Sequence, residues 1–318
     1  MIRTISCLAV IGSLFSCQSH GVTVRQDGDK ILVTIGGEVF AAHHKGGGSF
    51  TKPYLFPVYG AGGKLMTRAY PIQDAVPGEE KDHTHHTGIW FAHGDVSGVD
   101  LWHGPKHKNG GRIVEDAVAE MSSGSVGVLR TENHYENGAG KTICTESRTM
   151  RFFGDENGRF IDFDITVHAD HGAVVMGDTK EGIMAIRLPA TLRLKGRVAR
   201  GAAVTSAGIK GPKGWGTRGT WADYRGYVDG EDVGVAIFDH PSNPVHPTRW
   251  LIRDYGLFGA NPFGLMHFEG KPPGTGSVEI PSGGELRFRY RFYFHRGGPD
   301  QASVAERYAL FAGRDRPE

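Results

Sequence analysis

The 318-residue sequence has few of the features from which disulfide frameworks, membrane spans or nucleic-acid surfaces are made. It contains three cysteines, and two of them, Cys7 and Cys17, lie near the N-terminus. Beyond them no run of about 20 apolar residues could form a membrane-spanning helix. The 36 Lys and Arg residues nearly cancel the 35 Asp and Glu residues, so no net charge attracts a polyanion. These absences favour a neutral partner and give no support for nucleic-acid binding.

Standard motifs for phosphates and metals are also missing. The glycine-rich stretches 46–48 and 208–219 match neither GxxxxGK[ST] nor a GxGxxG between a strand and a helix. No HExxH or CxxC pattern is present to supply most of a zinc site. The sequence therefore indicates neither a nucleotide nor a zinc-protease motif.

The N-terminus has the pattern of a bacterial export signal. Arg3 precedes an apolar run over residues 5–15, and the stretch 14–17 (LFSC) is similar to a lipobox, in which the cysteine carries the lipid. We expect residues 1–16 to be a lipoprotein signal peptide. The mature chain is then exported and held in the periplasm or at the outer membrane by a lipid anchor on Cys17, with ordinary secretion after cleavage near Ser19 as the alternative.

Short alternating or β-branched runs dominate the remaining chain. They predict strands at residues 30–35, 112–121, 125–131, 141–151, 160–169, 183–188, 233–239 and 285–295. Turn pairs such as Asn157 with Gly158 separate them, and the 48 glycines are about twice the usual share of about 7%. Helix is expected only around residues 104–108 and 301–311. We therefore predict an all-β fold in which residues 17–318 form one large antiparallel two-sheet sandwich with a C-terminal helix. Cys144 lies in one of the strand-like runs and is expected to be buried.

Histidines cluster in the segment from residue 82 to residue 107. In an extended segment His83 and His85 point to the same side, which suits two metal ligands or two contacts to a sugar. Imidazole titrates near pH 6.5, so such a pair beside a carboxylate can also supply an acid and a base. The further histidines of this segment are His86, His93, His103 and His107.

Two other blocks combine charged, polar and aromatic residues. In residues 178–187, Glu181 and Arg187 bracket a strand whose other residues are typical of a core. Burying an unpaired charge is costly, so these side chains are expected to form ion pairs or to serve a function. In residues 221–264, a proline-rich loop follows a strand and carries Asp239 and His240. Tryptophan and tyrosine near Asp, Asn, Arg and His form the mixture that sugars favour, because aromatic faces stack on C–H surfaces while polar groups bind hydroxyls.

The same blocks carry a family resemblance. The matching pieces are residues 52–57 (KPYLFP) with 67–68, residues 82–95, residues 178–182, residues 221–224, and residues 239–264. Together they resemble the bacterial PmoA-like family, named after methane oxygenase, over about residues 30–295. The resemblance implies a secreted or lipid-anchored protein and a β-supersandwich like that of galactose mutarotase. A membrane oxygenase subunit would need several apolar spans, which the mature sequence lacks.

The sequence therefore predicts an exported carbohydrate-active enzyme that acts on a glycoside or modified sugar by acid–base chemistry, as a hydrolase, lyase or epimerase. The catalytic candidates are His83, His85, His86, Glu181, Asp239 and His240. The substrate-binding candidates are Trp90, His93, Trp102, His103, Arg187, Trp221, Asp223, Arg253, Tyr255 and Asn261. One alternative is a non-catalytic glycan-binding lipoprotein. The other takes the family name literally and places copper or another divalent metal on His83 and His85.

Overall fold

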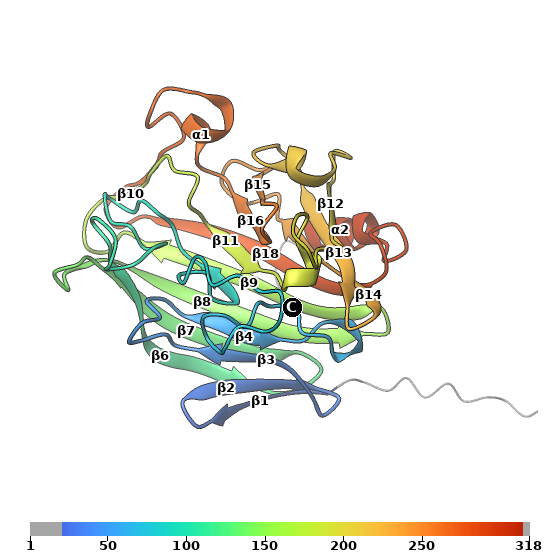
Figure 1. Cartoon of the computed structure of the whole chain (residues 1–318). Coiled ribbons are helices and arrows are strands. Elements are labelled where there is room, and N and C mark those ends of the chain that lie inside the picture. The colour runs from blue at the N-terminus through green and yellow to red at the C-terminus, as the bar shows by residue number, and fades with distance from the viewer. Residues whose placement is uncertain (1–20, 314–318) are drawn as a thin grey trace, which may run out of the picture.

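The computed structural model describes residues 21–313, so the predicted signal peptide and its cysteines lie outside the described residues. Eighteen strands and two α-helices occur in this part of the chain (Figure 1). The first sheet contains β1 (Val22–Asp27), β2 (Lys30–Ile35), β3 (Glu38–His44), β4 (Tyr54–Val58), β5 (Ile89–Phe91), β11 (Met184–Arg187), β16 (Leu257–Asn261) and β15 (Arg249–Ile252), in that order. The second contains β12 (Ala202–Thr205), β13 (Trp221–Val228), β14 (Glu231–Asp239), β18 (Glu285–Arg296), β9 (Gly158–His168), β8 (Thr142–Asp155), β7 (Gly127–Glu136) and β6 (Arg112–Ser122). A small third sheet pairs β10 (Val174–Met176) with β17 (Val278–Ile280).

Every named strand pair of the described residues is antiparallel, which confirms the predicted fold class. Buried and less buried residues alternate along β7, β8 and β9, as expected of strands with one face in a core. One hydrophobic core contains residues of both large sheets, such as Val33 and Leu55 from the first and Met150 and Ile161 from the second. Cys144 is fully buried in this core, as predicted, and burial raises the pKa of its thiol.

The C-terminal helix α2 (Val304–Ala312) confirms the prediction for this end of the chain. Val304 and Phe311 pack against Phe160, Phe238 and Tyr293 of the second sheet, and these residues form a separate small core. The helix thus covers apolar side chains of β9, β14 and β18 that water would otherwise contact.

The prediction of helix around residues 104–108 was wrong. This segment forms turns, and Gly104 has a φ of 85° while Asn109 has a φ of 58°. These left-handed conformations interrupt any helical run. The helices that occur besides α2 are the short α1 (Leu265–Glu269) and three 3₁₀ turns at Ala61–Gly63, Ala190–Leu192 and Gly211–Gly214. None of the helices in residues 21–313 combines the length and the apolarity that crossing a bilayer requires.

Candidate active site

Three neighbouring strands of the first sheet bring the histidine block and Tyr255 to the same end of β11. β11 pairs with β5 on one side and with β16 on the other, so that Arg187 at its end lies opposite Leu257. The backbone N–H of Arg187 donates to the carbonyl of Gly88, directly before β5, at 2.9 Å. Residues 82–88 lead into β5, and residues 253–256 form the turn before β16. Both connections therefore reach the end of β11.

Arg187 organises the beginning of the histidine block. Its guanidinium is buried and donates from Nη1 to Nδ1 of His86 at 2.9 Å and from Nη2 to Oδ1 of Asp82 at 2.7 Å. Arg68 donates to the same Asp82 oxygen, and His83 contacts the other Asp82 oxygen through Nδ1 at 2.6 Å. Burial alone would raise the pKa of Asp82, but Arg187, His83 and Arg68 together lower it to about 2. The carboxylate is thus ionised and holds two arginines.

Five histidines form a continuous group, which we call the imidazole cluster: His83, His85, His86, His103 and His107. The ring of His83 stacks on His86 with centroids 4.8 Å apart, and His86 meets His85 at 4.4 Å. His85 then contacts His103 at 4.5 Å, and His103 stacks on His107 at 4.4 Å. Tyr255 closes the other end, since its ring stacks on that of His83 at 4.9 Å.

A pocket of about 640 Å³ lies beside the imidazole cluster. Its wall contains His85, His103 and His107 from the cluster, together with aromatic and proline side chains. The complete lining is Gly48, Ser49, Phe50, Thr51, Lys52, Tyr70, Pro71, Thr84, His85, Thr87, His103, Pro105, Lys106, His107 and Arg112. The charged side chains among these described residues are all basic, so the pocket presents positive charge although the chain as a whole is nearly neutral.

Lys52 is the least expected member of this wall. Its side chain is buried, and Nζ donates to the carbonyl of Trp102 at 2.8 Å. Burial lowers the pKa of Lys52 to about 7, and Asp100 opposes this shift only in part. Burial also lowers the pKa of His85 far below its usual value, and Lys52 and His103 lower it further. His85 is therefore a neutral imidazole in a setting crowded with cationic groups.

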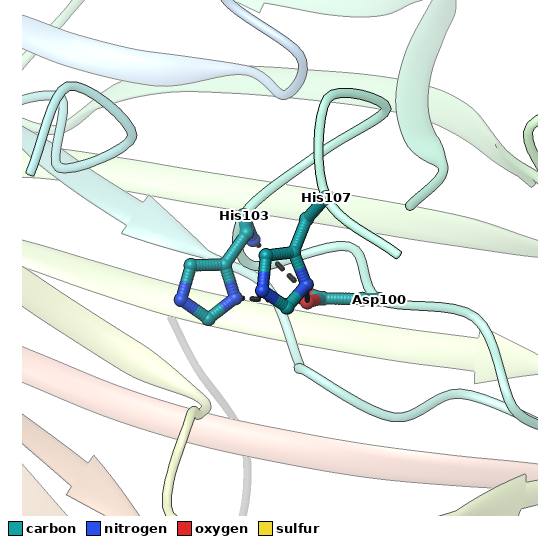
Figure 2. Close-up of side chains that lie close together, drawn as sticks. All are labelled: Asp100, His103 and His107. Carbon is teal, nitrogen blue, oxygen red and sulfur yellow. Dashed lines mark hydrogen bonds and ion pairs between the residues drawn. The ribbon is translucent and has the colours of Figure 1, made fainter. Parts of the chain in front are cut away.

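Asp100, His103 and His107 bring three possible metal ligands together (Figure 2). Oδ2 of Asp100 lies 2.8 Å from Nδ1 of His103 and 2.8 Å from Nδ1 of His107. The sequence suggested His83 and His85 as the metal ligands. Among the described residues, the ligand atoms that meet in a group of three belong instead to Asp100, His103 and His107. Nδ1 of His83 approaches Asp82 at 2.6 Å, and His83 and His85 belong to no such group of three in residues 21–313.

Several residues predicted to contact substrate are buried instead. Trp90 and Trp102 are 1% and 0% exposed, and they pack under the imidazole cluster, where His86 stacks on Trp90 at 5.1 Å. His93 is buried and bonded to the carbonyl of Gly177 at 2.8 Å, and Asn261 is fully buried and donates to the carbonyl of Thr179. Trp90 and Trp102 support the imidazole cluster from below, whereas His93 and Asn261 lie at the opposite ends of β5 and β16, and all four side chains are buried.

Four further predicted site residues lie on or directly after strands of the second sheet: Asp239, His240, Asp223 and Trp221. Buried Asp239 accepts hydrogen bonds from Asn243, His246 and Thr248, while the ring of His240 packs edge-on against Phe311 of α2. Asp223 bonds Nε2 of His295 at 2.7 Å, and Trp221 packs on the small core under α2. These hydrogen bonds and ring contacts lie in and beside the second sheet, and none of them is to a histidine of the imidazole cluster. The carboxylate of Asp239 is thus engaged by Asn243, His246 and Thr248 and not by the histidines of the imidazole cluster that the sequence suggested as its partners.

Two other predicted residues do lie beside the cluster. The guanidinium of Arg253 lies over the rings of Tyr255, at 5.4 Å, and Trp215, at 5.7 Å. Glu181 is close enough to Tyr255 to act on it electrostatically: burial raises the pKa of Tyr255, and the Glu181 charge adds to that rise. The nearest charged group of Glu181 is Lys180, at 3.8 Å. Glu181 therefore lies near the cluster without bonding a histidine of the described residues.

Sequence reasoning missed Lys52, Asp82, Asp100 and His107 as site residues. A signal for two of them was present, because Asp100, His103 and His107 follow one another at intervals of three and four. Such spacing returns side chains to one side of a turn. Lys52 opens one of the pieces that carry the family resemblance, but nothing in the sequence assigned it a role, since it stands alone before an apolar strand-like stretch.

The solved structures to which the chain is similar are remote from it in sequence. A galactose mutarotase-like protein from Lactobacillus casei is 8% identical, with a TM-score of 0.38 over 86% of this chain and 100% of that chain. An alpha-galactosidase from Lactobacillus brevis is 9% identical, with a TM-score of 0.41 over 95% of this chain and 44% of that one. A glycoside hydrolase family 97 enzyme from Pseudoalteromonas sp. strain K8 is 8% identical, with a TM-score of 0.34 over 86% and 33%.

This chain therefore spans less than half of the length of the two glycosidases. No curated protein matches its sequence. The model of the family of unknown function DUF6807 matches residues 30–309, and the chain belongs to that family.

Proposed function

We propose that the protein is an exported carbohydrate-active enzyme that moves protons on an acidic sugar bound beside the imidazole cluster. The observation that carries this proposal is the pocket of about 640 Å³, in which His85, His103 and His107 share one wall with Lys52 and Arg112. Its volume falls in the range of roughly 300–1,000 Å³ that small-molecule sites occupy. Export rests on the signal pattern of residues 1–17, and the resemblance to the PmoA-like family supports it.

The lining suits a sugar that carries a negative charge. Phe50 and Tyr70 offer ring surface on which the C–H face of a pyranose can stack. The exposed Thr84 adds a hydroxyl group for its hydroxyls, and the exposed Arg112 complements a carboxylate, while the buried Lys52 adds its charge from behind the wall. An anion in this place would also relieve the crowding of cationic groups around His85. We therefore favour a uronate or another oxidised sugar over a neutral one.

The groups on the wall also bear on the type of reaction. Most glycoside hydrolases use two carboxylates, whereas no Asp or Glu is among the described residues that line this pocket. Imidazoles can instead remove a proton from the carbon next to a carboxylate. Returning a proton to that carbon gives epimerisation, and protonating the departing glycosidic oxygen gives elimination. We propose a lyase or epimerase, with His85 as the proton acceptor once the carboxylate of the bound sugar has raised its pKa.

Proton abstraction can be detected without knowing the product. The mature protein is incubated in D₂O with uronate-containing and with neutral oligosaccharides, and the sugars are followed by NMR. The proposal predicts deuterium at the carbon next to the carboxylate, or a new unsaturated or epimeric product, for the acidic sugars. Binding without exchange or product would replace the enzyme with a glycan-binding protein.

A further inference from the structure

We propose that Asp100, His103 and His107 form a binding site for one divalent first-row transition-metal ion. One possible ligand atom of each residue lies within 4.8 Å of those of the other two, Oδ2 of Asp100 lies 2.8 Å from Nδ1 of each histidine, and Figure 2 shows the three side chains converging. Two imidazoles and one carboxylate are a ligand set that zinc and iron proteins use when other positions are left open. The proposal concerns the metal alone and holds whether or not the pocket acts on a sugar.

The contact between His107 and Asp100 points to a metal ion shared by both residues rather than to a hydrogen bond between them. Nδ1 of His103 makes a hydrogen bond to Oδ2 of Asp100 at 2.8 Å. Nδ1 of His107 lies at the same distance from that oxygen, yet the contact is an ion pair without hydrogen-bond alignment. Donor atoms that surround a metal face the ion and not each other, so the misaligned approach of His107 is expected among its ligands, whereas His103 would exchange its hydrogen bond to Oδ2 for the ion.

The surrounding backbone holds the carboxylate in place. The other oxygen of Asp100, Oδ1, accepts hydrogen bonds from the N–H groups of Trp102 and His103, both at 3.0 Å. Hydrogen bonds from Asp100 N to Asn109 O at 2.9 Å and from Gly111 N to Asp100 O at 3.0 Å close the loop that carries the two histidines. An outer shell of this kind orients a metal ligand and leaves Oδ2 available.

The site is open towards the pocket. Asp100 is nearly buried, while the side chains of His103 and His107 are 26% and 56% exposed and line the pocket wall. A metal held by these three residues therefore keeps positions for water or for an oxygen of a bound molecule. Each histidine can bind the ion through Nδ1 in the neutral tautomer that carries its proton on Nε2.

The test measures metal binding directly. The protein is freed of metal with a chelator and titrated with Zn²⁺ by calorimetry, and Co²⁺ absorption reports the ligand set. We expect one Zn²⁺ per chain. Removing an outer-shell partner alone can lower metal affinity about 10-fold. His107→Gln and Asp100→Asn remove ligands themselves, so each should lower the affinity for Zn²⁺ by more than about 10-fold. His107 is largely exposed, so the His107→Gln variant should fold, which thermal unfolding without metal will show.

His134→Gln is the matched control, because His134 also approaches a carboxylate, that of Asp116, through Nδ1 at 2.8 Å but belongs to no group of three described ligands. It should bind Zn²⁺ as the wild type does. The proposal is overturned if the wild type binds neither metal, or if His107→Gln and Asp100→Asn bind as tightly as the control. Loss of binding in His83→Gln but not in His107→Gln would also overturn it and restore the pair suggested by the sequence.

Discussion

Arg187 donates a hydrogen bond to Nδ1 of His86 at 2.9 Å. A guanidinium can only donate, so His86 accepts at Nδ1 and carries its proton on Nε2. Burial lowers the pKa of His86 well below its usual value, and His85 and Arg187 lower it further, which keeps this imidazole neutral. The tautomer of the central histidine in the cluster is thus set by a residue of β11, about a hundred positions away in the chain.

Replacing Arg187 should destabilise the protein. Arg187→Met leaves the carboxylate of Asp82, whose side chain is 28% exposed, without one of its two arginines. Loss of one partner from a fully buried pair costs about 3–5 kcal/mol, and the partial exposure of Asp82 reduces our expectation to about 2 kcal/mol in the free energy of unfolding. Urea denaturation measures it. Arg25→Met, which removes an exposed pair with Asp27, should cost less than about 0.5 kcal/mol, and equal losses in both variants would contradict the account.

Gly88 should tolerate no side chain. A Cβ atom there would lie 2.0 Å from the carbonyl oxygen of Leu55, and its φ is 60°. Gly28 has a similar φ of 64° with no atom within 4 Å of the same position. Gly28→Ala should therefore cost about 1 kcal/mol from backbone conformation alone, and Gly88→Ala about 3 kcal/mol or more because β4 must also move. Thermal or urea unfolding of both variants tests this, and similar losses would refute the role of the close approach.

His93 should make the protein sensitive to acid. Its buried ring donates from Nε2 to the carbonyl of Gly177, and burial lowers its pKa to about 4 although that bond, Asp95 and Asp100 oppose the shift. Between about pH 6.5 and 4 the unfolded chain binds the extra proton, so the free energy of unfolding falls as the pH is lowered through this range. The full effect is on the order of 3 kcal/mol.

His93→Gln removes this titration and keeps a donor that can reach Gly177. The difference in unfolding free energy between wild type and variant should therefore shrink between pH 6.5 and 4, as measured by denaturant titration at each pH. A difference that does not vary with pH would show that His93 is not the group responsible.

Asp239 should matter for folding and not for catalysis. Its carboxylate accepts from Asn243 and His246, both at 2.7 Å, and from the N–H of Thr248 at 2.9 Å. Asp239→Asn puts an NH₂ group where an acceptor is needed and should lower the free energy of unfolding by about 3 kcal/mol. Turnover per folded molecule should stay within about twofold. A loss of turnover of about 100-fold with unchanged stability would return Asp239 to the active site.

The sequence predicted the strands better than the site, and the reason is physical. Alternation along residues 30–35 reports one buried face, and residues 285–295 alternate in the same way. The structure has strands at both places, although both faces of β18 are buried over residues 288–295. The histidine block was also recognised, because its residues are adjacent in sequence. Its partners are not adjacent: Lys52, Arg187 and Tyr255 reach the cluster only because β4, β5, β11 and β16 are neighbours in the first sheet.

The aromatic residues show where sequence composition could not distinguish a binding residue from a core residue. Trp90 and Trp102 stand in the histidine-rich block, and composition alone could not tell a sugar platform from a core residue. Their burial follows from the packing of the imidazole cluster on top of them. Likewise, Asp239 and His240 match the chemistry of an acid and a base but are placed by β14 in the other sheet.

The most direct test of the central claim is the turnover of a uronate-containing oligosaccharide by His85→Gln, compared with His134→Gln. His85 lines the pocket in contact with His103, whereas His134 lies on β7 beside Asp116. If His85 accepts the proton, His85→Gln should lower kcat by about 100-fold or more with KM changed only a few-fold, and His134→Gln should match the wild type. Equal kcat in His85→Gln and wild type, with both proteins folded, would contradict the assignment of the imidazole cluster as the catalytic site.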